Sequence, residues 1–413
     1  MMNELPKDWK WVKLGEIGKI ISGGTPSTAI QEYWNGKVNW ISPADLTGYK
    51  KKTIINGAKS ISEVGLKNSS ARLMPKGSVL FSSRAPIGYV VIAGSELSTN
   101  QGFKSIIPNE NVDSDYIYYF LKGAKQKAEK VASGTTFKEI SLGKFSELEF
   151  PLPPKPTQQA IVSKIEELFS ELDKSIENLR TAQLQLKTYR QAVLKWAYEG
   201  KLTNGNLKEG ELPKGWKVAR LKEIASDISD GDHQAPPKSK SGVPFITISN
   251  VNKDNNRIDF TDTFSVNEEY YEKLKINRKP LKGDVLYTVT GSFGIPIIID
   301  FDKPFCFQRH IGLVRPLETT NQKWLYYLLQ SPDVFNQAKS TATGTAQKTV
   351  ALNSLRNFEV PYCKIEEQNK IVEEIDSRLS VADKMEESIT QSLQQAEALR
   401  QSILKKAFEG RLV

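Results

Sequence analysis

The chain carries a long internal repeat, in which similar segments recur about 207 to 210 residues apart. The clearest pairs are residues 5–10 and 212–217, 76–80 and 282–286, 116–121 and 324–329, and 190–202 and 400–412. Solenoid repeats are roughly 20 to 50 residues long, so this period is too long for a solenoid. The sequence therefore predicts a whole domain, with the helix that follows it, used twice.

The stretches between the matched segments differ between the two copies. Residues 24–27 read Gly-Thr-Pro-Ser, whereas residues 231–234 read Gly-Asp-His-Gln. The matched positions are mainly apolar, glycine or helix-forming, which is typical of a shared scaffold. Two copies of one scaffold thus present two different loop surfaces, a pattern that suits a protein recognising two different targets.

Length and composition are those of a globular protein with two or three domains. The 413 residues are 39% hydrophobic and 25% charged. The sequence holds no run of 18 apolar residues and no signal-peptide pattern, so we expect a cytoplasmic protein without membrane association. Cys306 and Cys363 lack metal or redox spacing, so we expect free thiols.

The net charge of +9 is concentrated in the two repeated domains. Residues 1–153 hold 20 Lys and Arg against 14 Asp and Glu, and residues 211–361 hold 20 against 17. The remaining segments, 154–210 and 362–413, hold 17 of each sign together. This distribution fits a polyanionic partner that touches both domains, although a modest excess of positive charge can also serve solubility alone.

Each copy is predicted to be an α+β domain. Short β-branched and aromatic runs between turn residues predict strands at residues 37–41, 79–81, 89–92 and 103–107, and at 243–248, 285–289, 295–299 and 312–314. The aromatic runs 116–121 and 324–329 predict amphipathic helices whose tyrosines belong to the core. We expect recognition domains at residues 1–153 and 204–361, followed by long helices at 154–203 and 362–413.

Both predicted long helices carry an apolar stripe at heptad spacing. The seam is expected to contain Ile161, Ile165, Leu168, Leu172, Leu179, Leu186 and Val193, and Ile371, Ile375, Met385, Ile389, Leu399 and Ile403. A stripe sustained over four heptads is typical of a coiled coil. The internal pseudo-two-fold repeat favours antiparallel packing of the two helices, and two separate surface helices are the alternative.

The sequence lacks the common catalytic motifs. It contains no phosphate-binding loop of the GxxxxGK[ST] type, no HExxH and no metal-spaced Cys/His cluster, and no acidic-Pro-Pro-aromatic motif of amino-methyltransferases. Its two histidines, His233 and His310, both lie in the second copy, so they cannot serve a reaction shared by both copies. We therefore expect no catalytic residues, no metal and no cofactor in this chain.

The order of two variable domains and two long helices, with repeated boundary motifs, resembles the specificity subunit of type I restriction–modification systems. The motifs are Leu-Pro-x-x-Trp at residues 5–9 and 212–216, Lys-Gly-x-Val-Leu at 76–80 and 282–286, Gln-Gln-Ala-Ile-Val at 158–162 and Ala-Tyr-Glu-Gly-Lys-Leu at 197–202. The resemblance extends over essentially the whole chain.

This resemblance implies a non-enzymatic subunit that recognises double-stranded DNA. Each domain would read one half of a bipartite, asymmetric site, and the helices would fix the spacer. Two modification (methyltransferase) subunits would bind around the helices, and restriction subunits would join for cleavage. S-adenosylmethionine would bind the modification partner, and the chain alone could dimerise through its helices.

The resemblance identifies no base-contacting residues, so candidates come from polar and basic side chains in the loops that differ. They are Thr25, Ser27, Lys37, Ser83, Arg84 and Lys138 in the first copy, and His233, Gln234, Lys238, Thr290, Ser292, Arg309 and Lys348 in the second. Arg84 and Arg309 are the candidates for guanine, whose O6 and N7 suit a guanidinium group. A phosphate contact or a solvated side chain is the alternative for each.

Two other functions fit parts of the sequence. A coiled-coil scaffold with two protein-binding domains would need no DNA, and salt-sensitive binding to duplex DNA would distinguish it from a DNA-reading protein. A nuclease or methyltransferase acting alone is the other, and the missing motifs argue against it.

Overall fold

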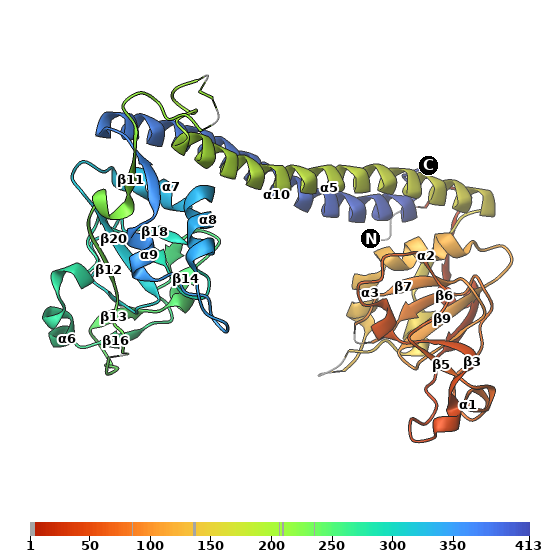
Figure 1. Cartoon of the computed structure of the whole chain (residues 1–413). Coiled ribbons are helices and arrows are strands. Elements are labelled where there is room, and N and C mark those ends of the chain that lie inside the picture. Colours follow the sequence, from red (N-terminus) through yellow and green to blue (C-terminus); the bar gives the residue numbers. More distant parts are fainter. Residues whose placement is uncertain (1–4, 85, 135–137, 206, 209, 235) are drawn as a thin grey trace. The chain divides into compact units, whose positions relative to one another are not determined.

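The computed structural model describes residues 5–84, 86–134, 138–205, 207–208, 210–234 and 236–413 (Figure 1). The chain forms two compact units. The first extends to Leu179 and resumes at Gln391, and the second comprises Arg180–Thr390. Each unit therefore contains one globular domain together with one end of each long helix.

The globular domain of the first unit is built on a five-stranded sheet of order β2-β9-β6-β7-β4. A three-stranded sheet, β5-β3-β8, and the pair β1-β10 complete it. The strands are β1 (Lys10–Lys13), β2 (Gly18–Ser22), β3 (Trp34–Ile41), β4 (Thr53–Ile54), β5 (Lys59–Ile61), β6 (Val79–Ser82), β7 (Val90–Ala93), β8 (Ser98–Thr99), β9 (Phe103–Pro108) and β10 (Glu149–Leu152). The helices of this domain are α1 (Glu63–Lys67), α2 (Ser114–Gly123), α3 (Lys125–Val131) and α4 (Leu142–Ser146).

Helix α2 covers one face of the five-stranded sheet, against β6 and β7 (Figure 1). Successive residues of β6 point to opposite faces, so Val79 and Phe81 pack beneath α2 while Leu80 packs on the other face. Tyr116 and Phe120 of α2 are buried in the same core. The aromatic run is therefore core, as the sequence predicts.

The second unit repeats this plan. Its four-stranded sheet has the order β12-β20-β17-β18, beside a three-stranded sheet, β16-β13-β19, and the pairs β11-β21 and β14-β15. The strands are β11 (Lys217–Arg220), β12 (Ala225–Asp230), β13 (Val243–Ile246), β14 (Val251–Asn252), β15 (Arg257–Ile258), β16 (Phe264–Val266), β17 (Val285–Thr288), β18 (Pro296–Ile298), β19 (Cys306–Phe307), β20 (Ile311–Pro316) and β21 (Glu359–Tyr362). The helices are α6 (Glu268–Lys273), α7 (Gln322–Gln330), α8 (Pro332–Thr341) and α9 (Leu352–Arg356).

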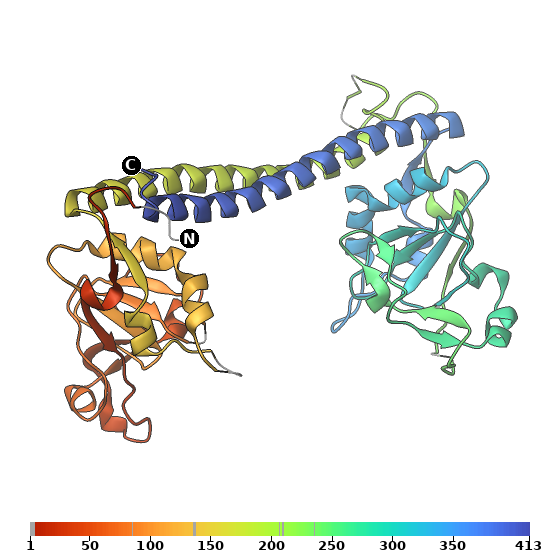
Figure 2. The same cartoon turned by 180° about the vertical axis from the view of Figure 1, so that it is seen from behind.

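Two helices of 44 residues each follow the domains: α5 (Lys155–Tyr198) and α10 (Ile365–Phe408). They lie side by side and antiparallel, since Asp173 pairs with Arg400 in the first unit and Arg190 pairs with Asp383 in the second (Figures 1 and 2). Each domain packs on both helices. In the first unit, Ile161 and Ile165 of α5 and Leu404 and Phe408 of α10 join the core beneath α2.

The predicted seam is correct for most positions, but Met385 and Leu399 are wrong. These two residues are 53% and 50% exposed, whereas Ile165 and Ile375 are fully buried. The facing positions are taken by the next residues along α10, Glu386 and Arg400, which pair with charges on α5. A long charged side chain with a partner across the helix pair can occupy a seam position, because its aliphatic part packs while its charge is neutralised.

A buried glutamine near the start of each long helix joins that helix to its domain. Gln158 Nε2 donates to the carbonyl oxygens of Pro153 (2.9 Å) and Asn111 (3.1 Å), and its Oε1 accepts from the Asp113 N–H. Gln368 makes the equivalent bonds to Cys363, Thr319 and Asn321. Both glutamines are fully buried. Each contact fixes the helix to the loop that begins α2 or α7.

Candidate nucleic-acid interface

Three strand ends meet at one edge of the sheet in the first unit. Ser22, the last residue of β2, pairs with Lys104 near the start of β9, and Ser82, the last residue of β6, pairs with Phe103. In an antiparallel sheet the end of one strand and the start of its neighbour lie together. The loops carrying Thr25 and Arg84 therefore converge at this edge.

Polar side chains at this edge contact one another. The Thr25 hydroxyl donates to Gln101 Oε1. Arg84 Nη1 lies 3.7 Å from Glu139 Oε2, and the two residues also form a backbone bridge. Lys104 Nζ lies 3.4 Å from Glu139 Oε1. We call this set, Thr25, Arg84, Gln101, Lys104 and Glu139, the first strand-end site.

The second unit has an equivalent strand-end site. The end of β12 at Asp230 pairs with Gly312, and the end of β17 at Thr288 pairs with Ile311 at the start of β20. His233, Thr290 and Arg309 from the adjoining loops line one cavity of about 410 Å³. The other lining residues are Asp230, Val289, His310, Gln347, Thr349, Val350, Ala351 and Leu352.

The electrostatics of the second site are mixed. His233 Nε2 lies 3.0 Å from Asp230 Oδ2. Partial burial and the neighbouring Arg309 lower the pKa of His310, which favours its neutral imidazole. Arg309 has an exposed side chain, and its N–H donates to the carbonyl oxygen of Asp232. The backbone of Arg309 is thus fixed while its guanidinium remains accessible.

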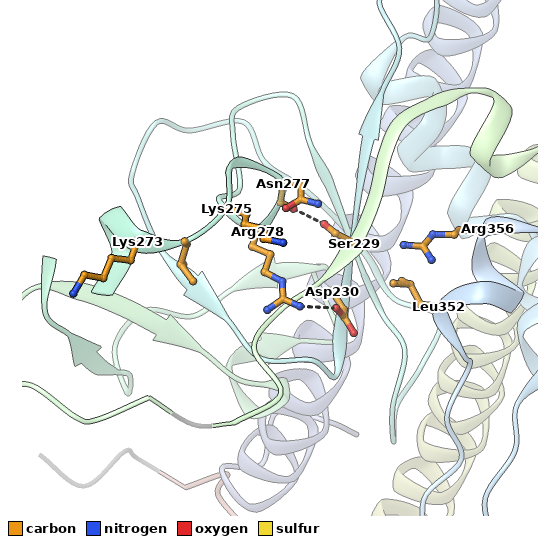
Figure 3. A pocket seen from close by; sticks show the side chains of 9 residues that line it. Ser229, Asp230, Lys273, Lys275, Asn277, Arg278, Leu352 and Arg356 are labelled. Carbon is orange, nitrogen blue, oxygen red and sulfur yellow. Dashed lines mark hydrogen bonds and ion pairs between the residues drawn. The ribbon is translucent and has the colours of Figure 1, made fainter. Parts of the chain in front are cut away.

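A more basic cavity of about 370 Å³ adjoins this site, sharing Asp230 and Leu352 with it (Figure 3). Its lining residues are Ser229, Asp230, Lys273, Leu274, Lys275, Asn277, Arg278, Leu352 and Arg356. Arg278 points toward Asp230 (Figure 3) and lies 3.7 Å from it and 3.3 Å from Asp232. Lysine and arginine side chains beside a polar cavity suit phosphate contacts, which position a protein on DNA without reading sequence.

The two strand-end sites use equivalent positions for different residue types. Gln101 and Arg309 each stand two residues before the strand they precede, and Arg84 and Thr290 each stand two residues after a strand. The backbone bridge between Arg84 and Glu139 recurs between Thr290 and Thr349. The arginine therefore follows β6 in the first site and precedes β20 in the second.

The remaining predicted residues lie around these sites or apart from them. Lys138, Gln234, Lys238 and Lys348 are exposed in loops, and Lys238 Nζ lies 5.1 Å from the centre of the Phe264 ring. The carbonyl oxygen of Ser292 accepts from Thr288. Ser27 and Lys37 are also exposed, but Lys37 belongs to β3 of the other sheet.

Two predicted contact residues are corrected by their burial. Ser83 is fully buried, and its hydroxyl accepts from Lys104 Nζ at 3.4 Å. Thr290 is 8% exposed, and its hydroxyl bonds that of Thr349 at 3.2 Å. Ser83 therefore offers no side-chain atom to DNA, and the Thr290 hydroxyl is engaged by Thr349 at the wall of the cavity that Thr290 lines.

The comparisons with known proteins agree with this architecture. The family model described as the type I restriction modification DNA specificity domain matches twice, over residues 6–184 and 213–395. The chain belongs to this DNA specificity family. The two matches correspond to the two copies of the repeat.

Two named relatives illustrate the similarity. The MjaIX specificity subunit of Methanocaldococcus jannaschii is 37% identical over 262 residues, which are 61% of this chain and 60% of that protein. The MjaVIII specificity subunit of the same organism is 25% identical over 99% of this chain and 94% of that protein. Both relatives are named specificity subunits. This agrees with the prediction that this chain is a non-catalytic subunit.

Solved structures share the fold. A chain from a type I R-M system, solved to explain complex assembly and conformational transition, aligns with a TM-score of 0.72 at 21% identity. The HsdS subunit of Thermoanaerobacter tengcongensis aligns with a TM-score of 0.64 at 20% identity. Each alignment covers 99% of both chains.

Several residues of the two strand-end sites were not predicted from the sequence. Gln101, Lys104 and Glu139 complete the first strand-end site, and Thr349 and Asp230 complete the second. Of these residues, only Gln101 could have been found from the sequence. An alignment of the two copies on β9 and β20 shows that it stands at the position equivalent to Arg309. Lys104 and Glu139 belong to no recognisable sequence motif, and only the folded structure brings them into contact.

The described residues hold neither a metal-binding cluster nor a membrane-spanning helix. No group of three His, Cys, Asp or Glu side chains there could hold a metal ion. None of the helices in that same part of the chain is long and apolar enough to cross a membrane.

Proposed function

We propose that this chain reads a bipartite, asymmetric DNA site, with one half-site for each domain. The observation that supports this most directly is the difference between the strand-end sites. One scaffold edge carries Arg84 beside Glu139 in the first copy and Arg309 beside His233 in the second. Since base edges differ in their donors and acceptors, unlike side chains on equivalent scaffolds would select unlike bases.

Each domain is fixed to the helix ends that it touches, which supports a role of the helices in setting the spacer. The buried glutamines and the shared cores join each domain to both helices. A helix of 44 residues is about 66 Å long at 1.5 Å per residue. Half-sites one helical turn apart are separated by roughly 34–36 Å, which is within that length.

The proposed partners are double-stranded DNA, two modification subunits bound around the helices, and restriction subunits in the full assembly. S-adenosylmethionine would be supplied by the modification subunits, and this chain would need no cofactor. A cytoplasmic location follows from such a role. The chain without partners could form a homodimer through its helices.

The experiment that tests this function is selection from a randomised duplex library by the chain co-purified with its modification subunit. We expect enrichment of two unlike short motifs at one fixed spacing, with retention that falls steeply as salt rises. Absence of enrichment, with retention insensitive to salt, would favour a scaffold that binds proteins instead of DNA.

A further inference from the structure

We propose that Glu139 is a specificity-determining residue of the first domain, which holds Arg84 in the position that reads one base pair. This inference rests on the proposed function. The ion pair and the backbone bridge between the same two residues carry it. A single contact of 3.7 Å between half-exposed side chains would be weak, but the bridge also fixes the two backbones beside each other.

Lys104 supplies a structural reason for the carboxylate of Glu139 at this edge of the sheet. Its side chain is only 7% exposed, and its ammonium lies 3.4 Å from Glu139 Oε1 and 3.4 Å from the Ser83 hydroxyl. Among the described residues, Glu139 is the one carboxylate that forms an ion pair with Lys104. A buried ammonium requires a paired charge, so Lys104 anchors Glu139 independently of Arg84.

This anchoring gives Glu139 a defined role when DNA binds. Because Lys104 keeps Glu139 in place, the carboxylate can hold one side of the Arg84 guanidinium while the other nitrogens are directed to a guanine. The same carboxylate limits the directions from which the guanidinium approaches. A guanidinium that must donate to both O6 and N7 needs such an orientation, because bidentate contact depends on geometry.

The second copy serves as a comparison within the same chain. There, Thr349 occupies the position of Glu139, Thr290 that of Arg84 and Gly312 that of Lys104. All three charges are therefore absent together, and the arginine of this copy stands elsewhere, at Arg309. The arginine, the carboxylate and the lysine are thus present together in one copy and absent together from the equivalent positions of the other.

The test is the library selection repeated with the Glu139→Gln complex. We expect the preference at one base pair of one half-site to fall about tenfold, with the other half-site and the spacing unchanged. Glu139→Gln in an Arg84→Ala background should cause no further change at that base pair, because the carboxylate acts through the arginine.

Glu147→Gln is the matched control. Glu147 lies in the same domain and pairs with Lys13 at 2.5 Å, away from the strand-end site, so its selection profile should equal that of the unmodified complex. Thermal unfolding of each complex shows whether a variant has lost its structure. If Glu139→Gln unfolds, Glu139→Asp, which keeps the charge but shortens the reach, should retain the fold and lose part of the preference.

The outcomes separate this inference from the proposed function. If the unmodified complex selects no motif, the proposed function fails. If it selects two motifs and folded Glu139→Gln selects the same two with unchanged preference, the role of Glu139 is wrong. Uniform weakening across all sequences would assign Glu139 to phosphate positioning or stability, and would also overturn the inference.

Discussion

Arg190 of α5 lies 2.7 Å from Asp383 of α10, measured from Nη2 to Oδ1. The same nitrogen lies 2.9 Å from Glu386 Oε2. The pair recurs in the first unit with the helices exchanged, where Arg400 of α10 meets Asp173 of α5. An arginine at the same heptad position of each helix thus bonds an acidic residue on the other, which favours the antiparallel register.

Charge reversal tests this register. Arg190→Glu would place three acidic groups together, and we expect it to lower the free energy of unfolding by about 1 kcal/mol, or roughly 2 to 4 °C in Tm. The effect stays small because the Asp383 side chain is 69% exposed and that of Glu386 is 45% exposed, so water screens the charges. Arg190→Glu combined with Asp383→Arg should recover part of the loss in thermal unfolding. Equal Tm values for single and double variants would contradict the prediction.

Replacement of Gln158, the buried glutamine that joins α5 to its domain, should lower the free energy of unfolding more than the charge reversal does. Gln158→Leu leaves the Asp113 N–H and two carbonyl oxygens without their partner in a buried place. We expect the free energy of unfolding to fall by about 3 kcal/mol in urea titrations, since each unsatisfied buried group costs about 1–3 kcal/mol. Gln159→Leu, at the exposed neighbouring position, is the control and should change stability by less than about 0.5 kcal/mol.

The two arginines should act on different half-sites. We expect Arg84→Ala to relax the preference in one half of the selected site and Arg309→Ala to relax it in the other, each by about tenfold at one base pair. The library selection measures both. If either variant weakened binding to all sequences equally, that arginine would be a phosphate contact.

The spacing of the half-sites should follow helix length. Deletion of residues 179–185 from α5 and 389–395 from α10 removes one heptad from each helix and leaves the flanking Arg190 and Arg400 pairs in place. The helices become about 10 Å shorter. We expect the selected spacer to shorten by about three base pairs, at 3.4 Å each, or recognition to be lost. A folded deletion variant that selects the original spacer would refute the role of the helices.

The two thiols should be inert in the folded protein. Burial raises the pKa of Cys306 and Cys363 to about 12. Because this pKa lies above the working pH, both thiols stay protonated at pH 8, and the thiolate is the reactive form. We expect no alkylation by iodoacetamide in buffer at pH 8 and complete alkylation of both residues in denaturant. Rapid labelling of the folded chain would contradict the burial.

The fold was largely predictable because the internal repeat presents the sequence pattern of each element in two copies. β6 and β17 are short apolar runs with every residue buried, which is the composition of strands covered on both faces, and each strand prediction is supported by its copy. Met385 and Leu399 were misassigned because a heptad pattern counts apolar residues, whereas Glu386 and Arg400 take seam positions through partners on the other helix.

The strand-end sites were only partly predictable. Arg84 and Arg309 remain predicted contact residues, which the structure places in the loop after β6 and in the loop before β20. The burial of Ser83 was missed because segments remote in sequence contact it: its backbone bonds Gly102 and Ile140, and its hydroxyl bonds Lys104. Lys104 and Glu139 belong to a strand and a distant loop, and no local pattern relates them.

The displacement of the arginine between the two sites has a consequence for the evolution of new targets. Arg84 has a threonine as its structural counterpart, and Arg309 has a glutamine. If Arg84 and Arg309 both read a base, as proposed, the base-reading position differs between the two domains, and a rule based on one aligned position would fail in one of them. A change of target would proceed by relocating a functional group across a constant framework, together with the neighbours that support it.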